Sequence, residues 1–248
     1  MSLDKLKKIN SYKRDQRIKF DSKNHVYSID GNDNYISATE LVSKFFPAFE
    51  KDFWADKQSK KTGVPKEEII KEWEERGNKA REAGTMLHSQ IERYYNNMEY
   101  EKNLDVIKFL DFEKKYILDQ YKPYRTEWKI FDEECLIAGT VNIIYKKKGG
   151  ELFIFDWKRS KNIIKKDGTV DNKNPFENGM KGLSHLSSTD YVKYTLQQNI
   201  YKYILEKNYN KKISSMNLLI LHPNYINFHV VQVEEMKKET EYLIANSK

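Results

Sequence analysis

Three short apolar runs, rich in residues that favour strands, lie close together in the middle of the chain, at residues 127–131, 136–145 and 151–157. An acidic turn joins the first two runs. A lysine-rich turn that ends in Gly149-Gly150 joins the last two, and paired glycines allow the positive φ that a tight hairpin needs. The pattern therefore predicts three consecutive strands connected by short turns.

Apolar residues repeat at helical spacing on both sides of these strands. The longest helical pattern covers residues 66–97, follows Pro65 and is expected to break near Gly84. Before the three strands we expect a helix at 104–121. After them we expect a helix at 187–208, strands at 216–222 and 226–233, and a last helix at 234–246. This order predicts an α/β fold with a mixed central sheet of about five strands flanked by helices.

The N-terminal part has a pattern of its own. Residues 18–29 alternate around a turn and predict a small hairpin. A helix capped by Ser37 or Thr39 is expected next, followed by a second helix over residues 48–61.

Length and composition agree with a core that carries an added lobe. The chain has 248 residues, of which 39% are hydrophobic, so it is long enough to bury a core. We expect residues 1–75 to form an arm, a hairpin and a helical lobe, and residues 76–248 to form the core, with a mobile basic loop at 162–186. We expect no membrane span and no secretory signal.

The charge balance points to one class of partner. The net charge is +7 and the isoelectric point is near 9.1, which suits a polyanion such as nucleic acid. An AT-rich genome would also enrich Lys, Asn and Ile codons, so charge alone has little weight. The single cysteine, Cys135, excludes an intramolecular disulfide and suits an intracellular, reducing compartment.

Candidate chemistry sits at the end of the third strand. Asp156 and Lys158 are two residues apart on a strand, so their side chains project to the same side. A carboxylate and an ammonium there, beside an acidic position on the neighbouring strand, can hold a divalent metal and activate water. That neighbouring position is Asn142, an amide. A solvated ion pair at an exposed strand end is the simpler alternative for Asp156 and Lys158.

Two helices carry further polar patterns. His88, in Gly84-Thr85-x-x-His88, shares a helix face with Glu92. Alone, such a histidine is more often an ordinary helix residue than a metal ligand. Gln197 and Tyr201 share a face of the later helix, and core packing explains Tyr201 nearly as well as a role in a site.

Taken together and in order, these motifs resemble the PD-(D/E)xK nuclease superfamily and are most similar to its RecB-like exonuclease branch. That branch includes the mitochondrial genome maintenance exonuclease and the lambda-type exonucleases. The resemblance covers residues 80–205 and rests on Gly84-Thr85-x-x-His88, Gly139-x-x-Asn142, Asp156-x-Lys158 and Gln197-x-x-x-Tyr201. It implies a restriction-endonuclease-like core and hydrolysis of DNA phosphodiester bonds, from an end, with Mg²⁺ or Mn²⁺.

The resemblance also implies roles for single residues. The metal would be held by His88, Asp156, the position of Asn142 and the main-chain carbonyl of Trp157. Lys158 would orient the attacking water and stabilise the charge that develops on the phosphate. Gln197 and Tyr201 would support Lys158 and the scissile phosphate. The residues expected behind these are Glu92 and Glu127.

Asn142 departs from the family pattern, which has Asp there. A neutral amide oxygen binds divalent cations weakly, so we expect this chain to cleave DNA poorly or not at all. One explanation is a deliberate Asp→Asn substitution that traps uncleaved DNA, and the other is a silent homologue that only binds. The intact partner residues favour the first, because a decaying site loses several members.

DNA contacts are expected from basic and small polar residues near the motifs, which would neutralise phosphates without reading bases. They are Arg76, Lys79, Arg81, Thr85, Arg159, Ser160 and Lys161. Four aromatic residues could stack on unpaired bases, although packing inside the helical lobe is favoured: Phe53, Trp54, Tyr94 and Tyr95. Single- or double-stranded DNA, strand polarity and oligomeric state stay open. The rival readings are a catalytically inactive DNA-binding protein and a lysine-rich interaction domain.

Overall fold

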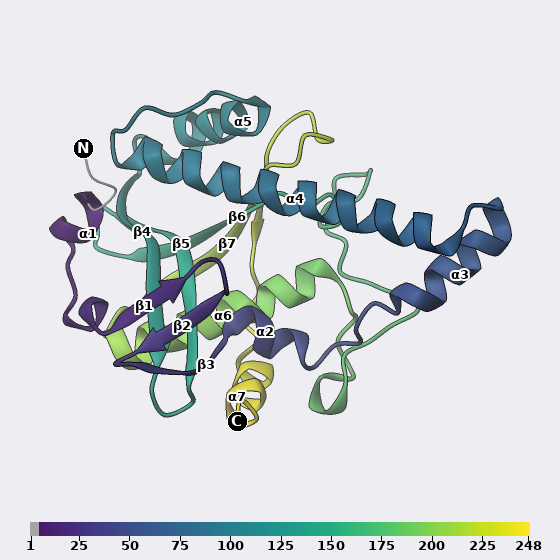
Figure 1. Cartoon of the computed structure of the whole chain (residues 1–248). Helices are drawn as coiled ribbons and strands as arrows, with labels where there is room; N and C mark the ends of the chain where they lie inside the picture. Colours follow the sequence, from purple (N-terminus) through teal and green to yellow (C-terminus); the bar gives the residue numbers. More distant parts are fainter. Residues whose placement is uncertain (1–4) are drawn as a thin grey trace.

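The computed structural model describes residues 5–248 and is built around one mixed sheet with helices on both faces (Figure 1). The strands are β1 (Ile18–Asp21), β2 (Val26–Ile29), β3 (Asn32–Ser37), β4 (Tyr121–Asp132), β5 (Ile137–Lys147), β6 (Leu152–Lys158), β7 (Ile213–Ile220) and β8 (His229–Gln232). The helices are α1 (Lys5–Ile9), α2 (Ala38–Ser43), α3 (Lys51–Thr62), α4 (Lys66–Tyr95), α5 (Leu104–Phe112), α6 (Asp190–Tyr209) and α7 (Lys237–Ala245). Shorter helical turns cover Lys13–Gln16, Glu113–Ile117 and Lys181–Leu183.

The sheet divides at β5. Antiparallel β4 pairs with β5 along its whole length, so the other edge of β5 serves two partners. On that edge, parallel β3 pairs with Ile137 and Ala138, and antiparallel β6 pairs with residues 143–146. Residues 139–142 therefore lie in a fork between β3 and β6. The sheet continues from β6 through parallel β7 to antiparallel β8.

Strand alternation distributes the core over two layers. Ile144, Ile154 and Leu218 point to the face covered by α2, α6 and α7. Their strand neighbours, such as Tyr145 and Phe155, point to the face covered by α5 and the second half of α4. In Figure 1, α4 and α5 lie above the sheet and α6 lies below it.

The sheet is larger than expected, with eight strands in place of about five. The predicted core strands are β4 to β8, and the three additional strands come from the N-terminal segment. The hairpin expected at residues 18–29 is β1 and β2. β3 was missed because it begins with Asn32-Asp33-Asn34, which has the composition of a turn, and gains its place through parallel pairing with a strand about a hundred residues away.

Helix α4 is a single 30-residue helix, without the break expected near Gly84. Its first half packs on α3, where Ala55 and Ile69 are buried, and the two helices form a projecting hairpin that we call the arm, residues 51–81 (Figure 1). Gly63 joins them in the left-handed conformation, φ +76°, that glycine adopts without strain. The boundary expected between residues 75 and 76 falls inside α4.

The segment 162–186 is irregular, as expected, but it is anchored to the core. Ile163 and Leu183 are fully buried, and short bridges pair Ile164 with Val170 and Asn178 with Ser187. The following helix begins at Asp190, because Thr189 accepts a capping hydrogen bond from the main chain of Val192. In the described part of the chain, no helix is both long and apolar enough to cross a lipid bilayer.

Candidate active site in the fork of the sheet

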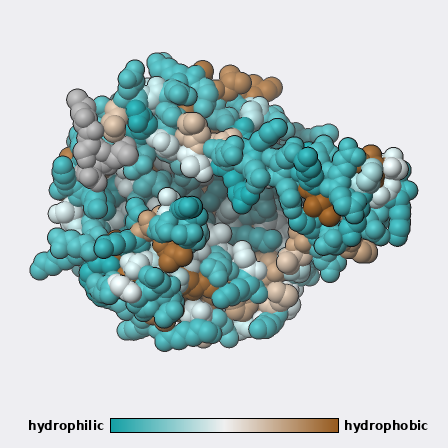
Figure 2. Space-filling view, in the orientation of Figure 1, coloured by the Kyte–Doolittle hydropathy of each residue, from teal (hydrophilic) through white to brown (hydrophobic). Residues whose placement is uncertain are grey.

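A cleft of about 850 Å³ opens where β3 and β6 separate. Figure 2 shows the molecule hollowed below α4, with mostly hydrophilic residues around the opening. The walls come from the β1–β2 hairpin, α2, α4, β4, β5, β6 and α6. The predicted site residues that line it are Arg81, Thr85, His88, Glu127, Asn142, Asp156, Lys158, Gln197 and Tyr201.

Asp156 and Lys158 lie on the same side of β6, as their spacing predicted, and they form a nearly buried ion pair. Lys158 Nζ lies 2.7 Å from Asp156 Oδ2, and the two side chains are 14% and 5% exposed. Gln198 of α6 donates a second hydrogen bond to the same Asp156 oxygen at 2.8 Å. The ring of Tyr194 lies 4.1 Å from Lys158 Nζ and offers the ammonium its π-face. An isolated solvated pair is therefore the wrong description of Asp156 and Lys158.

Helix α6 connects this pair to the N-terminal segment. Gln197 accepts a hydrogen bond from Lys158 Nζ at 3.2 Å and donates one to Thr39 Oγ1 at 2.5 Å. Thr39 belongs to α2. The side chain of Ser37 caps this helix by accepting a hydrogen bond from the main-chain N–H of Glu40. Gln197 of α6 therefore holds the Lys158 side chain, and Thr39 of α2, about 160 residues earlier in the chain, holds Gln197 in turn.

Tyr201 is packed at the base of the fork. A Cβ added at Gly139 would lie 2.4 Å from Tyr201 Cε1, so only glycine lets β5 pass this ring. Burial raises the pKa of the Tyr201 phenol well above its ordinary value. Tyr201 is therefore a neutral packing residue beneath the site, consistent with both roles considered for it.

Asn142, Glu127 and His88 make the other side of the site. Asn142 Oδ1 accepts a hydrogen bond from the Trp157 main-chain N–H at 3.0 Å, and Asn142 Nδ2 faces Glu127 Oε1 at 3.5 Å. His88 Nδ1 lies 3.6 Å from the same Glu127 oxygen. The Trp157 side chain is buried in the core, and only its main chain borders the site.

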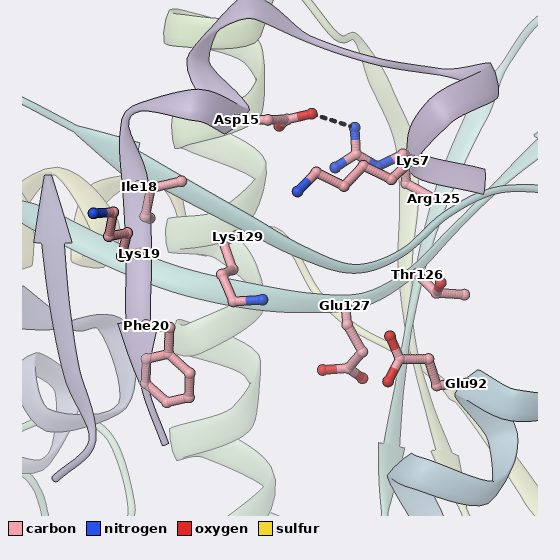
Figure 3. Close-up of a pocket in the computed structure, with 10 residues that line it drawn as sticks. All are labelled: Lys7, Asp15, Ile18, Lys19, Phe20, Glu92, Arg125, Thr126, Glu127 and Lys129. Carbon is pink, nitrogen blue, oxygen red and sulfur yellow. Dashed lines mark hydrogen bonds and ion pairs between the residues drawn. The ribbon is translucent and has the colours of Figure 1, made fainter. Parts of the chain in front are cut away.

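A smaller cavity of about 160 Å³ adjoins the cleft and shares Phe20, Glu127 and Lys129 with it. Figure 3 shows the carboxylates of Glu92 and Glu127 pointing toward each other at one end of this cavity. An ion pair of 2.8 Å between Arg125 and Asp15 lies at the other end (Figure 3). Glu92 is therefore beside Glu127 in the smaller cavity, and it does not line the cleft that contains Asp156 and Lys158.

The predicted DNA contacts divide into two groups. Arg81 and Thr85 are exposed in the cleft. Outside it, Arg76 pairs with Glu72, Arg159 pairs with Asp105 at 2.7 Å, and Ser160 donates to Asp190 at 2.9 Å. Lys79 is exposed on the arm, and the carbonyl of Lys161 accepts from Tyr225.

Several cleft residues carried no sequence signal that we recognised. The β1–β2 hairpin supplies Phe20, His25 and Tyr27, with the Phe20 and Tyr27 ring centroids 4.4 Å apart. Burial raises the pKa of Tyr27 to about 12. Behind the cleft, the buried Gln198 lies next to the predicted Gln197, and only the helix rotation shows which of the two glutamines contacts Asp156. The other additions are Ser22, Ser37, Thr39, Lys129 and Thr140.

The donors suit a hard divalent cation in kind, since they comprise an imidazole, carboxylates and an amide oxygen. The charge is incomplete, because position 142 contributes none and its amide already bonds to Trp157 and faces Glu127. Among residues 5–248, no three side chains of His, Cys, Asp or Glu lie close enough together to hold a metal ion.

No family model and no curated protein matches the chain. A solved structure described as "Crystal structure of SSO0001" is similar over 87% of this chain and 76% of that chain, with 14% sequence identity and a TM-score of 0.37. A likeness this distant says nothing about function. The functional conclusion therefore has to come from the residues in the cleft.

Proposed function

We propose that the cleft is the active site of a metal-dependent DNA nuclease of the PD-(D/E)xK type, acting from strand ends, and that Asn142 impairs it. The observation that carries the proposal is the convergence of Asp156, Lys158 and Gln197 with His88 and position 142 in one cleft. These residues come from four separate elements. The motifs come from residue spacing and a family resemblance, and residues matched by chance would have no reason to meet.

The chain's own residues divide the work of hydrolysis. Asp156 and His88, with a carboxylate at position 142, would hold the cation, and bound Mg²⁺ or Mn²⁺ would supply Lewis acidity toward water and phosphate. Lys158, held by Asp156 and Gln197, presents an ammonium to the charge that develops on the scissile phosphate. Gln198 fixes the Asp156 carboxylate, and Glu127 faces the imidazole of His88.

The surroundings of the cleft favour binding that does not depend on base sequence. Arg81 and Lys129 line it as cations, and neither makes an ion pair with a residue between 5 and 248. Such groups neutralise phosphates and position the backbone without reading bases.

Restoring the acid at position 142 tests the proposal. The Asn142→Asp variant with Mn²⁺ is expected to degrade end-labelled single- or double-stranded DNA, whereas the chain with Asn142 is expected to be at least 100-fold slower, on the order of the loss for one catalytic electrostatic group. Adding Lys158→Ala to the restored variant should abolish the activity. Degradation that survives Lys158→Ala would exclude this cleft as its source.

A catalytically inactive DNA-binding protein is the second candidate, and one observation favours it. The Asn142 amide oxygen accepts from the Trp157 N–H, and its NH2 group faces the Glu127 carboxylate. Both polar groups of Asn142 therefore have partners without a cation. If Asn142→Asp binds DNA and leaves it intact at every Mn²⁺ and Mg²⁺ concentration, this second function replaces the first.

A further inference from the structure

A hollow of about 440 Å³ lies on the arm, away from the cleft, and aromatic rings and lysines line it. We call it the arm hollow. Phe49 is 65% exposed and Trp54 is 38% exposed, and Trp73 completes the aromatic lining. The expectation that the aromatic residues of this lobe are packed away is therefore wrong for Phe53 and Trp54, although Tyr95 is buried as expected.

The arm does not need these rings for its own stability. Its small core is made by Ala55 and Ile69, which are buried between α3 and α4. Phe49 and Trp73 contact each other with ring centroids 5.6 Å apart and leave their outer faces open. Large apolar rings on a surface that is otherwise charged mark an interaction site. In Figure 2, which looks into the cleft, apolar side chains also show on the arm.

The charge of the arm hollow narrows the choice of partner. Lys57 lies with its ammonium 4.9 Å from the Trp54 ring centroid, and Lys61 is exposed. Neither has an ion-pair partner among residues 5–248, so both charges are available. Four other basic residues of the arm are held in the ion pairs Lys51–Glu74, Lys60–Asp56, Lys66–Asp52 and Arg76–Glu72, whereas Lys71, Lys79 and Arg81 are exposed and do not line the arm hollow. Aromatic faces beside unpaired lysines are what a single nucleic-acid strand recognises, with bases on the rings and phosphates on the ammonium groups.

One helix face joins the arm hollow to the cleft. Trp73, Arg81 and His88 lie within an arc of about 80° on α4, at 3.6 residues per turn. Trp73 lines the arm hollow, and the other two line the cleft. Gly77 and Gly84 lie on the same face, and nothing stands within 4 Å of a Cβ built on either. The distance along the helix axis from His88 to Trp73 is about 22 Å, the length of about six stacked nucleotides.

We propose that the arm hollow binds unpaired bases of a single DNA strand whose end lies in the cleft. The proposal rests on the proposed function for the direction of the strand, but it concerns binding and needs no cleavage. It commits the enzyme to substrates with single-stranded character, because bases in a duplex cannot stack on Phe49, Trp54 or Trp73.

Binding of fluorescent oligonucleotides to the full chain tests the proposal. A Trp54→Ala, Trp73→Ala double variant is expected to weaken binding of a single strand of about twelve nucleotides fivefold or more, the effect of losing one or two stacked bases. Binding of a strand of about three nucleotides and of a blunt duplex should stay within about twofold. The Lys57→Ala, Lys61→Ala variant should weaken binding of the long strand and reduce its salt dependence.

Matched controls separate stacking from general effects. Phe176→Ala removes an exposed aromatic ring outside the arm, and Lys60→Ala removes a paired lysine from α3, so both should bind like the parent. Thermal unfolding of each variant confirms that the arm keeps its fold. Unchanged binding of the long strand by the tryptophan variant, or an equal loss for long strand and duplex, would overturn the proposal.

Two further results are informative. If the chain is a dimer and the tryptophan variant is a monomer, the arm hollow is an interface between copies, and the proposal is wrong. If no variant and no parent binds any DNA, the proposed function fails together with it, whereas loss of long-strand preference alone leaves the proposed function intact.

Discussion

Glu127 has a left-handed backbone, φ +44°, in the middle of β4, where a residue with a Cβ is strained. The same residue directs its carboxylate at His88 and Asn142 and borders both cavities. Strain of this kind persists only where the surrounding structure imposes it. We infer that the fold positions this carboxylate for the site, and that strand pairing alone would not place it there.

Asn142→Asp is expected to make stability depend on metal. An aspartate in the same rotamer would keep the hydrogen bond from Trp157 and place its second oxygen about where Nδ2 lies, 3.5 Å from Glu127 Oε1. Two facing carboxylates destabilise the fold by about 1–2 kcal/mol at this site, where residue 142 is buried and Glu127 is 24% exposed, and a cation between them reverses the loss. Thermal unfolding in chelator should show a Tm lower by about 5 °C, regained in Mn²⁺.

The parent with Asn142 is the first control and should unfold at nearly the same temperature with and without Mn²⁺. Glu127→Gln added to the aspartate variant is the second, and it should remove the destabilisation in chelator. A metal response that is the same for parent and variant would mean that the cation binds elsewhere.

Gly139→Ala tests the packing under the fork. The new methyl would lie 2.4 Å from Tyr201, whose ring is enclosed, so the ring or β5 must move. We expect a loss of about 1–3 kcal/mol in the free energy of unfolding, measured in urea. Gly77→Ala, in an open position inside α4, should instead gain about 0.5–1 kcal/mol. Equal effects of the two substitutions would contradict the packing described here.

At the residue scale, short motifs identified four residues that line the cleft, namely Asp156, Lys158, Gln197 and Tyr201. The alternation of a strand placed Asp156 and Lys158 on one side, and helical spacing placed Gln197 above Tyr201. Gln198 escaped because one residue along a helix turns the side chain by about 100°, and only packing decides which of two adjacent glutamines faces Asp156. The sequence pattern alone does not predict which of two neighbouring helix residues contacts the site.

At the element scale, local pattern predicted the strands of the core and failed where distant segments pair. β3 carries the composition of a turn and joins the sheet through two residues of β5, a pairing with no local signal. Helix α4 was expected to break at glycine, but each glycine costs only about 1 kcal/mol, and packing on α3 and on the sheet outweighs that cost. Both differences shape the site, because β3 forms one side of the fork and α4 joins the cleft to the arm.

The helical turn after α5 contains a buried acid. Tyr145 Oη donates to Glu113 Oε1 at 3.2 Å, and Tyr95 contacts the same oxygen. Burial raises the pKa of Glu113 above its ordinary value of 4.5, more than these hydrogen bonds lower it. The folded state therefore holds a proton that the unfolded state releases, so this group's stabilisation is full below about pH 4.5 and declines as the pH rises through the folded pKa.

Glu113→Gln should remove that pH dependence. The variant's free energy of unfolding, relative to the parent, is expected to rise as the pH increases above about 4.5 and to level off above the folded pKa of Glu113, measured by urea unfolding. Glu82→Gln, an exposed change on α4, should show no such trend. A relative stability that is flat or falls with pH would mean that Glu113 is ionised in the folded chain across this range.

At the scale of the whole molecule, the cleft lies between the N-terminal segment and the predicted core. Both parts contribute residues to its lining. The β1–β2 hairpin and α2 supply Phe20, Tyr27 and Thr39, while β5, β6 and α6 supply the motif residues. Composition predicted a negatively charged partner, but it did not show where on the protein the unpaired positive charges lie. Some of the basic residues are paired with carboxylates at the surface, and unpaired ones line the cleft, as Arg81 and Lys129 do, and the arm hollow, as Lys57 and Lys61 do.

This distribution predicts which cations set the salt dependence of DNA binding. Arg81 and Lys129 line the cleft without ion-pair partners among the described residues, so each should release about one counterion on binding. Arg81→Ala or Lys129→Ala should lower the slope of log K against log salt by roughly 0.7–0.9, measured by fluorescence anisotropy without metal. Lys148→Ala, in the turn at the opposite end of β5, should leave the slope unchanged although it removes the same charge. If all three substitutions lower the slope equally, the net charge of +7 attracts DNA over the whole surface, and the cleft is not its path.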